Sequence, residues 1–172
     1  MCVCVCVCIF FSDAPRGTGK IFVTKLLPAK IRQQKGITVA IASSGIATTL
    51  LLVGRMAHSN FKLSFNASAS NSANCNITKD SVKAEVLRKC QLIFWDECTM
   101  VHKGSFDALD RTPKEIQVCI SPMRGVSLLL SGDFRQTLPI IPKGTRADAV
   151  MACITLSSLW QDVTILTLTT NE

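Results

Sequence analysis

The chain has 172 residues, a length that fits one domain, and 48% of them are hydrophobic, which is enough to bury a core. Its formal net charge of +7 is typical of a protein with a polyanionic partner, although a solvated basic surface would give the same value. No apolar run reaches the roughly 18 residues that a membrane helix needs, so we expect no membrane span. The cysteines beyond the first eight residues are scattered without a C-x-x-C pair, which argues against a zinc site and against a disulfide framework.

The first eight residues, MCVCVCVC, form a low-complexity leader with several interpretations. Metal binding by the four cysteines is disfavoured, because alternate side chains of an extended chain lie on one face and make a poor tetrahedral cage. A secretory signal would need a basic start and a small-residue cleavage site, which are missing here. Val7 onward is expected to begin a buried strand. Alternating cysteine and valine is also what a TG dinucleotide repeat encodes. On this hypothesis, the start of the gene lies in a microsatellite that is fused to a truncated gene.

Along the rest of the chain, apolar runs of strand length alternate with segments of helical length. The pattern predicts strands at residues 7–12, 37–42, 91–97, 125–134 and 163–168. It predicts helices at residues 20–34, 43–52, 81–89 and 103–111, and a helical turn at 157–161. The first helix contains Pro28, which we expect to kink it, and the last is expected to stop near Pro113. Residues 64–79 and 138–144 are expected to be loops.

This alternation predicts an α/β fold, a mostly parallel sheet with helices on both faces. In such sheets ligands bind beyond the carboxyl ends of the strands. Three of the predicted strands end in polar segments, RGTGK, WDE and GDFRQ. Their shared position makes that edge of the sheet the candidate site.

RGTGK follows a strand and opens a helix, which is the arrangement of a phosphate-binding loop. The full pattern is G-x-x-x-x-G-K-[ST], and Gly19 and Lys20 fit it. Ala14 stands at the first glycine position, and Ile21 stands at the position of the hydroxyl. A glycine turn before a helix remains the alternative.

LIFWDE has the form of the second half of an ATPase site, a buried strand that ends in two acids. Asp96 could hold Mg²⁺ through water and Glu97 could polarise an attacking water, unless both are merely solvated acids at a strand end. GDFRQ brings Asp133, Arg135 and Gln136 to the same edge. Gln136 could sense a γ-phosphate or orient water, and Arg135 could also be an ordinary surface arginine.

Longer stretches resemble the first motor domain of the PIF-type DNA helicases, which are superfamily-one 5′-to-3′ enzymes, and especially the branch found in Helitron transposons. The resemblance covers Ile9 to Glu172, and it is carried by SSGIATTLL, GRMAHSNFKL, LIFWDECTMVHKGSFDALDRT, SGDFRQTLPIIPKGTRAD and LTLTTNE. It implies a RecA-like P-loop NTPase fold and an ATP-dependent DNA helicase activity. Residues 1–8 would be a leader and residues 9–172 the first motor lobe, without the second lobe that unwinding requires.

The resemblance also implies roles for individual residues. The catalytic pair would be Glu97 and Gln136, and Asp96 would hold the metal. Nucleotide binding would involve Gly17, Thr18, Gly19, Lys20 and Ile21, and DNA binding or coupling would involve Ser44, Gly45, His58 and Arg135. For His58, a packed histidine without such a role is an equal alternative.

ATP and Mg²⁺ are the cofactors that the resemblance implies, and single-stranded or duplex DNA is the implied partner. It also implies a nuclear or mitochondrial location and roles in repair, recombination and telomere maintenance. The chain departs from the family pattern at Ala14, Arg16 and Ile21, and Ile21 offers no hydroxyl to Mg²⁺. These departures predict impaired nucleotide handling. They leave open an inactive RecA-like module that binds nucleic acid or a partner protein.

Overall fold

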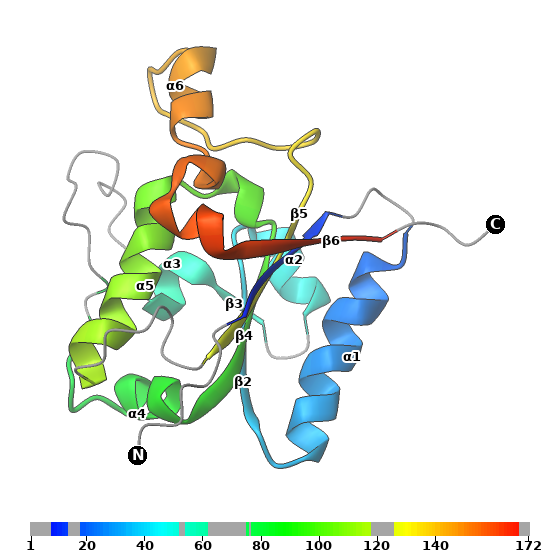
Figure 1. Cartoon of the computed structure of the whole chain (residues 1–172), viewed down its shortest axis with the longest axis vertical. Helices are drawn as coiled ribbons and strands as arrows, with labels where there is room; N and C mark the ends of the chain where they lie inside the picture. The colour runs from blue at the N-terminus through cyan, green and yellow to red at the C-terminus, as the bar shows by residue number, and fades with distance from the viewer. Residues whose placement is uncertain are drawn as a thin grey trace.

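A computed structural model describes residues 8–13, 18–51, 54–61, 75, 77–117 and 126–168, with the backbone alone for 112–117. Six strands form one parallel sheet in the order β3-β2-β4-β5-β1-β6 (Figure 1). The strands are β1 (Ile9–Asp13), β2 (Ile37–Ala42), β3 (Arg55–Met56), β4 (Cys90–Asp96), β5 (Ser127–Gly132) and β6 (Val163–Thr167). The predicted α/β class with a parallel sheet is confirmed.

Helices cover both faces of the sheet (Figure 1). They are α1 (Lys20–Gln33), α2 (Gly45–Leu50), α3 (Ala57–Phe61), α4 (Val82–Lys89), α5 (Lys103–Gln117) and α6 (Arg146–Met151), with 3-10 turns η1 (Cys98–Met100), η3 (Ile154–Leu156) and η4 (Ser158–Asp162). Within the described ranges, no helix is long and apolar enough to cross a membrane.

Alternating side chains of the strands divide the core into two layers. Ile41, Ile93 and Trp95 pack with α3, α4 and α5 on one face, in the larger cluster of buried residues. Ala40 and Phe94 point to the other face, where α2 and Ile31 of α1 cover them. Because the central strands are buried on both faces, they are apolar at nearly every position, as the sequence pattern indicated.

Local signals explain several helix boundaries. Ser81 caps α4 by accepting a hydrogen bond from the Ala84 N–H, and Ser44 caps α2 by accepting one from the Ala47 N–H. At α6, Thr145 and Asp148 form a reciprocal capping box. The sequence predicted a serine-capped helix at residues 43–52. The cap is confirmed, and the capping residue is Ser44, the second residue of that segment.

Proline positions were the weakest guide to the helices. α1 continues through Pro28 to Gln33, and Pro28 itself is buried. The prediction that the fifth helix stops near Pro113 is wrong, since α5 runs to Gln117. Phe106 and Leu109, each about 1% exposed, anchor the preceding turns in the core. Tertiary packing of this kind can outweigh the roughly 3 kcal/mol that a proline costs inside a helix.

Candidate nucleotide-binding site

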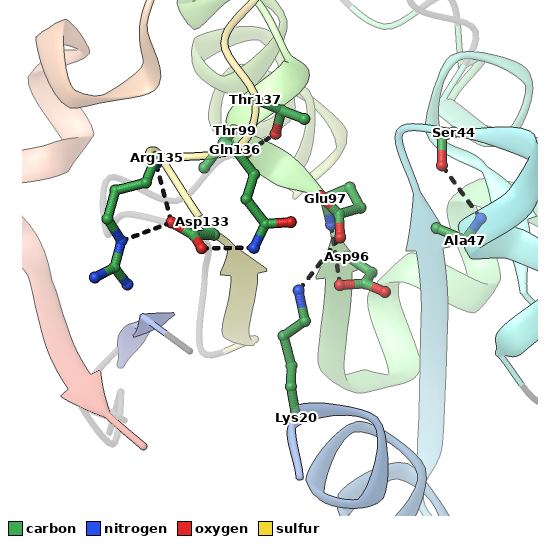
Figure 2. A network of polar contacts seen from close by, with 10 residues as sticks. All are labelled: Lys20, Ser44, Ala47, Asp96, Glu97, Thr99, Asp133, Arg135, Gln136 and Thr137. Carbon is green, nitrogen blue, oxygen red and sulfur yellow. Dashed lines mark hydrogen bonds and ion pairs between the residues drawn. The ribbon is translucent and has the colours of Figure 1, made fainter. Parts of the chain in front are cut away.

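The strand order brings the three polar segments to one edge of the sheet. β5 lies between β4 and β1, so the segments that follow these three strands are neighbours although they are far apart in sequence. Lys20 follows β1, Asp96 ends β4 with Glu97 directly after it, and residues 133–136 follow β5. Figure 2 shows Lys20, Glu97 and Gln136 pointing toward one another beyond the strand ends, with Asp96 and Asp133 beside them and Arg135 on the far side of Asp133. The predicted juxtaposition of the described end of RGTGK with WDE and GDFRQ is therefore present.

Lys20 is the first residue of α1, and its ammonium group pairs with Glu97. Lys20 Nζ donates to Glu97 Oε1 at 3.2 Å, and the two side chains are 18% and 28% exposed. Gly19 precedes the helix with φ of 77°, a left-handed conformation that favours glycine. Phe22 and Val23 donate their N–H groups to the Gly19 carbonyl, which closes the first turn. The lysine is thereby held at the sheet edge by a backbone conformation that only a few residue types adopt easily.

Asp96 is a buried carboxylate at the end of β4. Burial raises its pKa, whereas the nearby Lys20 cation opposes the shift by favouring the ionised form. The Glu97 N–H donates to Asp96 Oδ1 at 3.0 Å. Glu97 itself has φ of 51°, so the chain turns sharply between the two acids and sends their side chains in different directions. The pair thus offers one buried and one more accessible carboxylate.

Asp133 organises the segment after β5. The Gln136 amide donates to Asp133 Oδ2 at 2.6 Å, and the Arg135 N–H and Nε donate to Oδ1 at 2.9 and 3.0 Å. Hydrogen bonds from Gln136 and then from Arg135 lower the pKa of Asp133 to about 2. Arg135 also lies 3.6 Å from Asp13, the last residue of β1. Asp133 therefore fixes both side chains, and Arg135 ties this segment to the strand before the phosphate loop.

Two further contacts anchor the same segment. Phe134 packs between Phe11 of β1 and Trp160 of η4, with ring centroids 5.2 and 5.7 Å away. The hydroxyls of Thr99 and Thr137 lie 2.8 Å apart and join the turn after β4 to the loop after β5. The Gln136 side chain extends from this anchored loop toward the Lys20–Glu97 pair (Figure 2).

The residues assigned to DNA binding or coupling occupy three places. Ser44 caps α2 and Gly45 is its first residue, to one side of Asp96 (Figure 2). The Ser43 N–H donates to the Asp96 carbonyl, so this loop adjoins the site. His58 lies in α3, where burial lowers its pKa. Arg135 is exposed and bonded to two acids, and these placements leave the DNA role of all four residues a prediction.

Other predicted residues contribute less. Gly17, with Ala14 and Arg16, lies outside the described residues. Thr18 is half-buried before α1, whereas Ile21 is 45% exposed and presents no polar atom on its side chain. Sequence reasoning named Asp133 as part of GDFRQ but did not give it the organising role that it has. The signal was its position at the end of a buried strand, like that of Asp96.

A parallel sheet, a lysine at the start of the first helix and two acids at the end of β4 are the arrangement of a RecA-like lobe. The sequence profile of the PIF1-like helicase family matches residues 6–172, and the chain belongs to that family.

Curated relatives are similar to the chain at about 30% identity over the matched residues. An ATP-dependent DNA helicase PIF1 of Danio rerio is 31% identical over 140 residues, 79% of this chain and 20% of that protein. An ATP-dependent DNA helicase PIF7 of Trypanosoma brucei brucei is 30% identical over 133 residues, 76% of this chain and 13% of that protein. The chain thus spans a small fraction of the curated relatives it matches.

Solved structures agree on the fold. The Pif1 helicase from Bacteroides in complex with ADP-AlF3 and single-stranded DNA superposes with a TM-score of 0.78 at 23% identity, covering 96% of this chain and 39% of that one. The Pif1 helicase from Candida albicans superposes with a TM-score of 0.74, covering 94% of this chain and 36% of that one. The predicted RecA-like fold and the predicted family are confirmed.

Proposed function

We propose that the chain is the nucleotide-binding motor lobe of an ATP-dependent 5′-to-3′ DNA helicase. The observation that carries the proposal is the meeting of Lys20, Asp96, Glu97 and Gln136 at one sheet edge. Family membership supports it, as does the Bacteroides relative with ADP-AlF3 and single-stranded DNA. Unwinding would require a second RecA-like lobe.

Each of these side chains has a role that its placement supports. Lys20, at the first residue of α1, would pair with the β- and γ-phosphates, where its charge and the N-terminal N–H groups of the helix both favour an anion. When phosphate takes over the Lys20 ammonium, Glu97 is released to orient and polarise water. Gln136 is positioned by Asp133 through its amide nitrogen, and a glutamine amide can donate to a γ-phosphate and accept from water.

The residues present fit Mg²⁺ in part. Asp96 offers a carboxylate oxygen, and Mg²⁺ commonly keeps its waters and binds one or two carboxylates plus substrate phosphates. The hydroxyl that family members supply is missing at Ile21, and the Thr24 hydroxyl is committed to the Ile21 carbonyl at 2.8 Å. Among the described residues no group of three or more acidic, histidine or cysteine side chains could hold a metal. Bound Mg²⁺ would neutralise phosphate charge, and among the described residues Asp96 is the one that would hold it.

DNA binding is the second part of the proposal. The net charge of +7 favours a polyanion, and the basic surface would make binding strongly dependent on salt. The α2 start with Ser44 and Gly45, together with His58 and Arg135, is the proposed contact region, and a nuclear or mitochondrial location follows from the same proposal. Single-stranded DNA is the track that the Bacteroides complex supports, and duplex DNA would be engaged only by the two-lobed enzyme.

Titration with a fluorescent ADP analogue tests the nucleotide site. Binding should be weakened at least about tenfold in Lys20→Ala, since a charge-assisted contact contributes about 1.5–3 kcal/mol. Lys25→Ala is the matched control, because Lys25 is exposed on the same helix one turn further on. Equal loss in both variants, or no binding by a chain that melts cooperatively, would overturn the nucleotide-binding proposal.

A second candidate function is an inactive RecA-like module that binds nucleic acid or a partner. The missing hydroxyl at Ile21 favours it, because the Thr24 hydroxyl on the next turn of α1 is already bonded to the Ile21 carbonyl. The two candidates differ in Mg²⁺ dependence. An active lobe should bind the ADP analogue more tightly with Mg²⁺, whereas an inactive module should bind a labelled oligo(dT) without any response to nucleotide or metal.

A further inference from the structure

A cavity lies at the edge of the sheet farthest from β1. Its volume is about 370 Å³, and its walls come from β2, β3, α3, α4 and the last turns of α1. Arg32 lines it, twelve residues along α1 from Lys20, which corresponds to about 18 Å of helix. The cavity is therefore separate from the nucleotide site at the opposite end of α1.

The cavity lies over an open strand edge. β3 pairs with β2 only through Ile41↔Arg55 and Ala42↔Met56. Residues 37–40 of β2 pair with β4 on their other side, and among the described residues no strand pairs with them on this side. Four residues of strand span about 13 Å. An unpaired strand edge of this length presents backbone N–H and C=O groups that can pair with another extended chain.

The two sides of this edge differ in chemistry. Val39 points to the larger core layer, and Phe61 and Leu87 line the cavity on that side. Thr38 points to the opposite side, where α1 and Arg32 lie. The Thr38 hydroxyl is buried and has no hydrogen-bond partner in the part of the chain that the structure describes. The side that faces α4 is thus mainly apolar, with Arg55 and Lys83 also on it, whereas the side of Thr38 carries a hydroxyl and Arg32.

Among the described residues, the charged groups around the cavity are all positive. Arg32, Arg55 and Lys83 line it, and none of the described residues that line it is acidic. Lys83 donates to the Ser59 and Asn60 carbonyls at the end of α3, at 3.2 and 3.1 Å. Within the described ranges, neither guanidinium of Arg32 and Arg55 has a hydrogen-bond or ion-pair partner. The two arginines are therefore available to an incoming carboxylate.

We propose that this cavity binds an extended acidic peptide segment of a partner protein, which adds a strand to the open edge of β2. Its sequence alternates apolar and acidic residues. The apolar side chains enter the side lined by Phe61 and Leu87, while the carboxylates face Arg32 and the Thr38 hydroxyl, with Arg55 at the rim. Backbone pairing with residues 37–40 supplies register, and the alternation supplies specificity.

Nucleic acid fits this place less well than a peptide. Binding of single strands uses aromatic faces on which bases stack. Of the described residues that line the cavity, Phe61 alone is aromatic, and it is only 1% exposed, so its ring offers no stacking surface. The other described apolar residues of the lining are aliphatic, which suits valine- or isoleucine-sized side chains.

The test uses the full chain and a fluorescein-labelled peptide, Glu-Val-Glu-Val-Glu-Val-Glu, followed by fluorescence anisotropy. A peptide of the same composition in blocks, and one with lysine in place of glutamate, should bind at least about tenfold more weakly. The amides of an added strand point alternately toward β2 and away from it. N-methylation of one alternate set of peptide amides should therefore abolish binding, and N-methylation of the other set should leave binding intact. Equal binding of the alternating and block peptides would overturn the proposal.

Variants of the chain locate the peptide. Arg32→Glu and Arg55→Glu should each weaken binding at least about tenfold, whereas Lys25→Glu, the same charge change at an exposed α1 residue outside the cavity, should not. Lys20→Ala should leave peptide binding unchanged, so this test is independent of the proposed nucleotide site. No peptide binding by the folded chain, equal loss in Lys25→Glu, or displacement of the peptide by oligo(dT) through Arg32 and Arg55 would each overturn the inference.

Discussion

Lys20 Nζ lies 3.2 Å from Glu97 Oε1, so that two side chains 77 positions apart in sequence form one ion pair at the sheet edge. The pair joins the start of the phosphate-binding helix to the end of β4. In the nucleotide-free chain, each group satisfies the charge of the other. A phosphate that draws Lys20 away would leave Glu97 free at the point where water must be activated.

This relationship separates the roles of the two residues. In Glu97→Gln, ADP-analogue affinity should stay within about threefold of the original, a change of about 0.6 kcal/mol, because the amide releases Lys20 for phosphate. ATP hydrolysis by the lobe joined to its second lobe should be lost. Parallel titrations with Lys20→Ala check the separation, and equal loss of affinity in both variants would contradict it.

Restoring a hydroxyl next to Lys20 should restore metal dependence. Ile21 is 45% exposed, so Ile21→Thr leaves no cavity in the core. We expect Mg²⁺ to tighten ADP-analogue binding by about 10- to 100-fold in this variant, from one charge-assisted contact of about 1.5–3 kcal/mol. Ile21→Val has nearly the same shape without the hydroxyl and is the matched control. A Mg²⁺ response in the valine variant would show that the hydroxyl is not the cause.

Asp96 should cost stability at neutral pH. Burial raises its folded-state pKa above the unfolded value of about 3.9, so the folded chain loses stability as pH rises from that value through the raised pKa. Asp96→Asn cannot ionise and should escape this loss. In thermal melts from pH 4 to pH 8, the melting temperature of Asp96→Asn should increase relative to that of the original chain as pH rises. A constant difference across that range would count against a raised pKa.

Asp133 should behave in the opposite way. Its pKa is lowered to about 2, so its contribution to stability is complete above about pH 4 and is lost as pH falls toward 2. Asp133→Asn should cost about 1–3 kcal/mol of unfolding free energy at neutral pH and little at pH 2, because hydrogen bonds to a charged acceptor are replaced. Urea unfolding at several pH values measures this. Asp80→Asn, at an exposed turn residue, should show no comparable loss.

The left-handed residue before α1 should resist substitution. Gly19 has φ of 77° and open space where a Cβ would stand, so Gly19→Ala meets conformational strain without a clash. We expect a loss of about 1–2 kcal/mol in stability, together with weaker nucleotide binding as the loop shifts. Gly45→Ala also has open space but no positive φ, and it should be neutral or slightly stabilising. Similar melting temperatures for the two variants would contradict the strain argument.

Elements with a strong local pattern could be predicted well. Strand β2 and the capped helix α4 appear within a residue of their expected bounds, because a run that is apolar except for Thr38 and a serine cap are both visible in the sequence. The sequence contained no comparable signal for β3 and α3. β3 has two residues, and it exists because β2 offers it an edge.

The residues of the candidate site were named from the sequence, but their contacts were not. Strand ends in WDE and GDFRQ indicated acids at a sheet edge, whereas the position of β5 between β4 and β1 decided which of them meet. The link from Asp13 through Arg135 and Asp133 to Gln136 depends on that order.

By itself, the sequence determined the fold class, the family pattern and the residue types at the strand ends, since these depend on periodicity and on short motifs. The tertiary structure alone decided the Lys20–Glu97 pair, the opposite pKa shifts of Asp96 and Asp133, and the open edge of β2. The physical reason is the same in each case. Burial, charge pairing and strand adjacency depend on distances between residues far apart in the chain, and no local pattern encodes those distances.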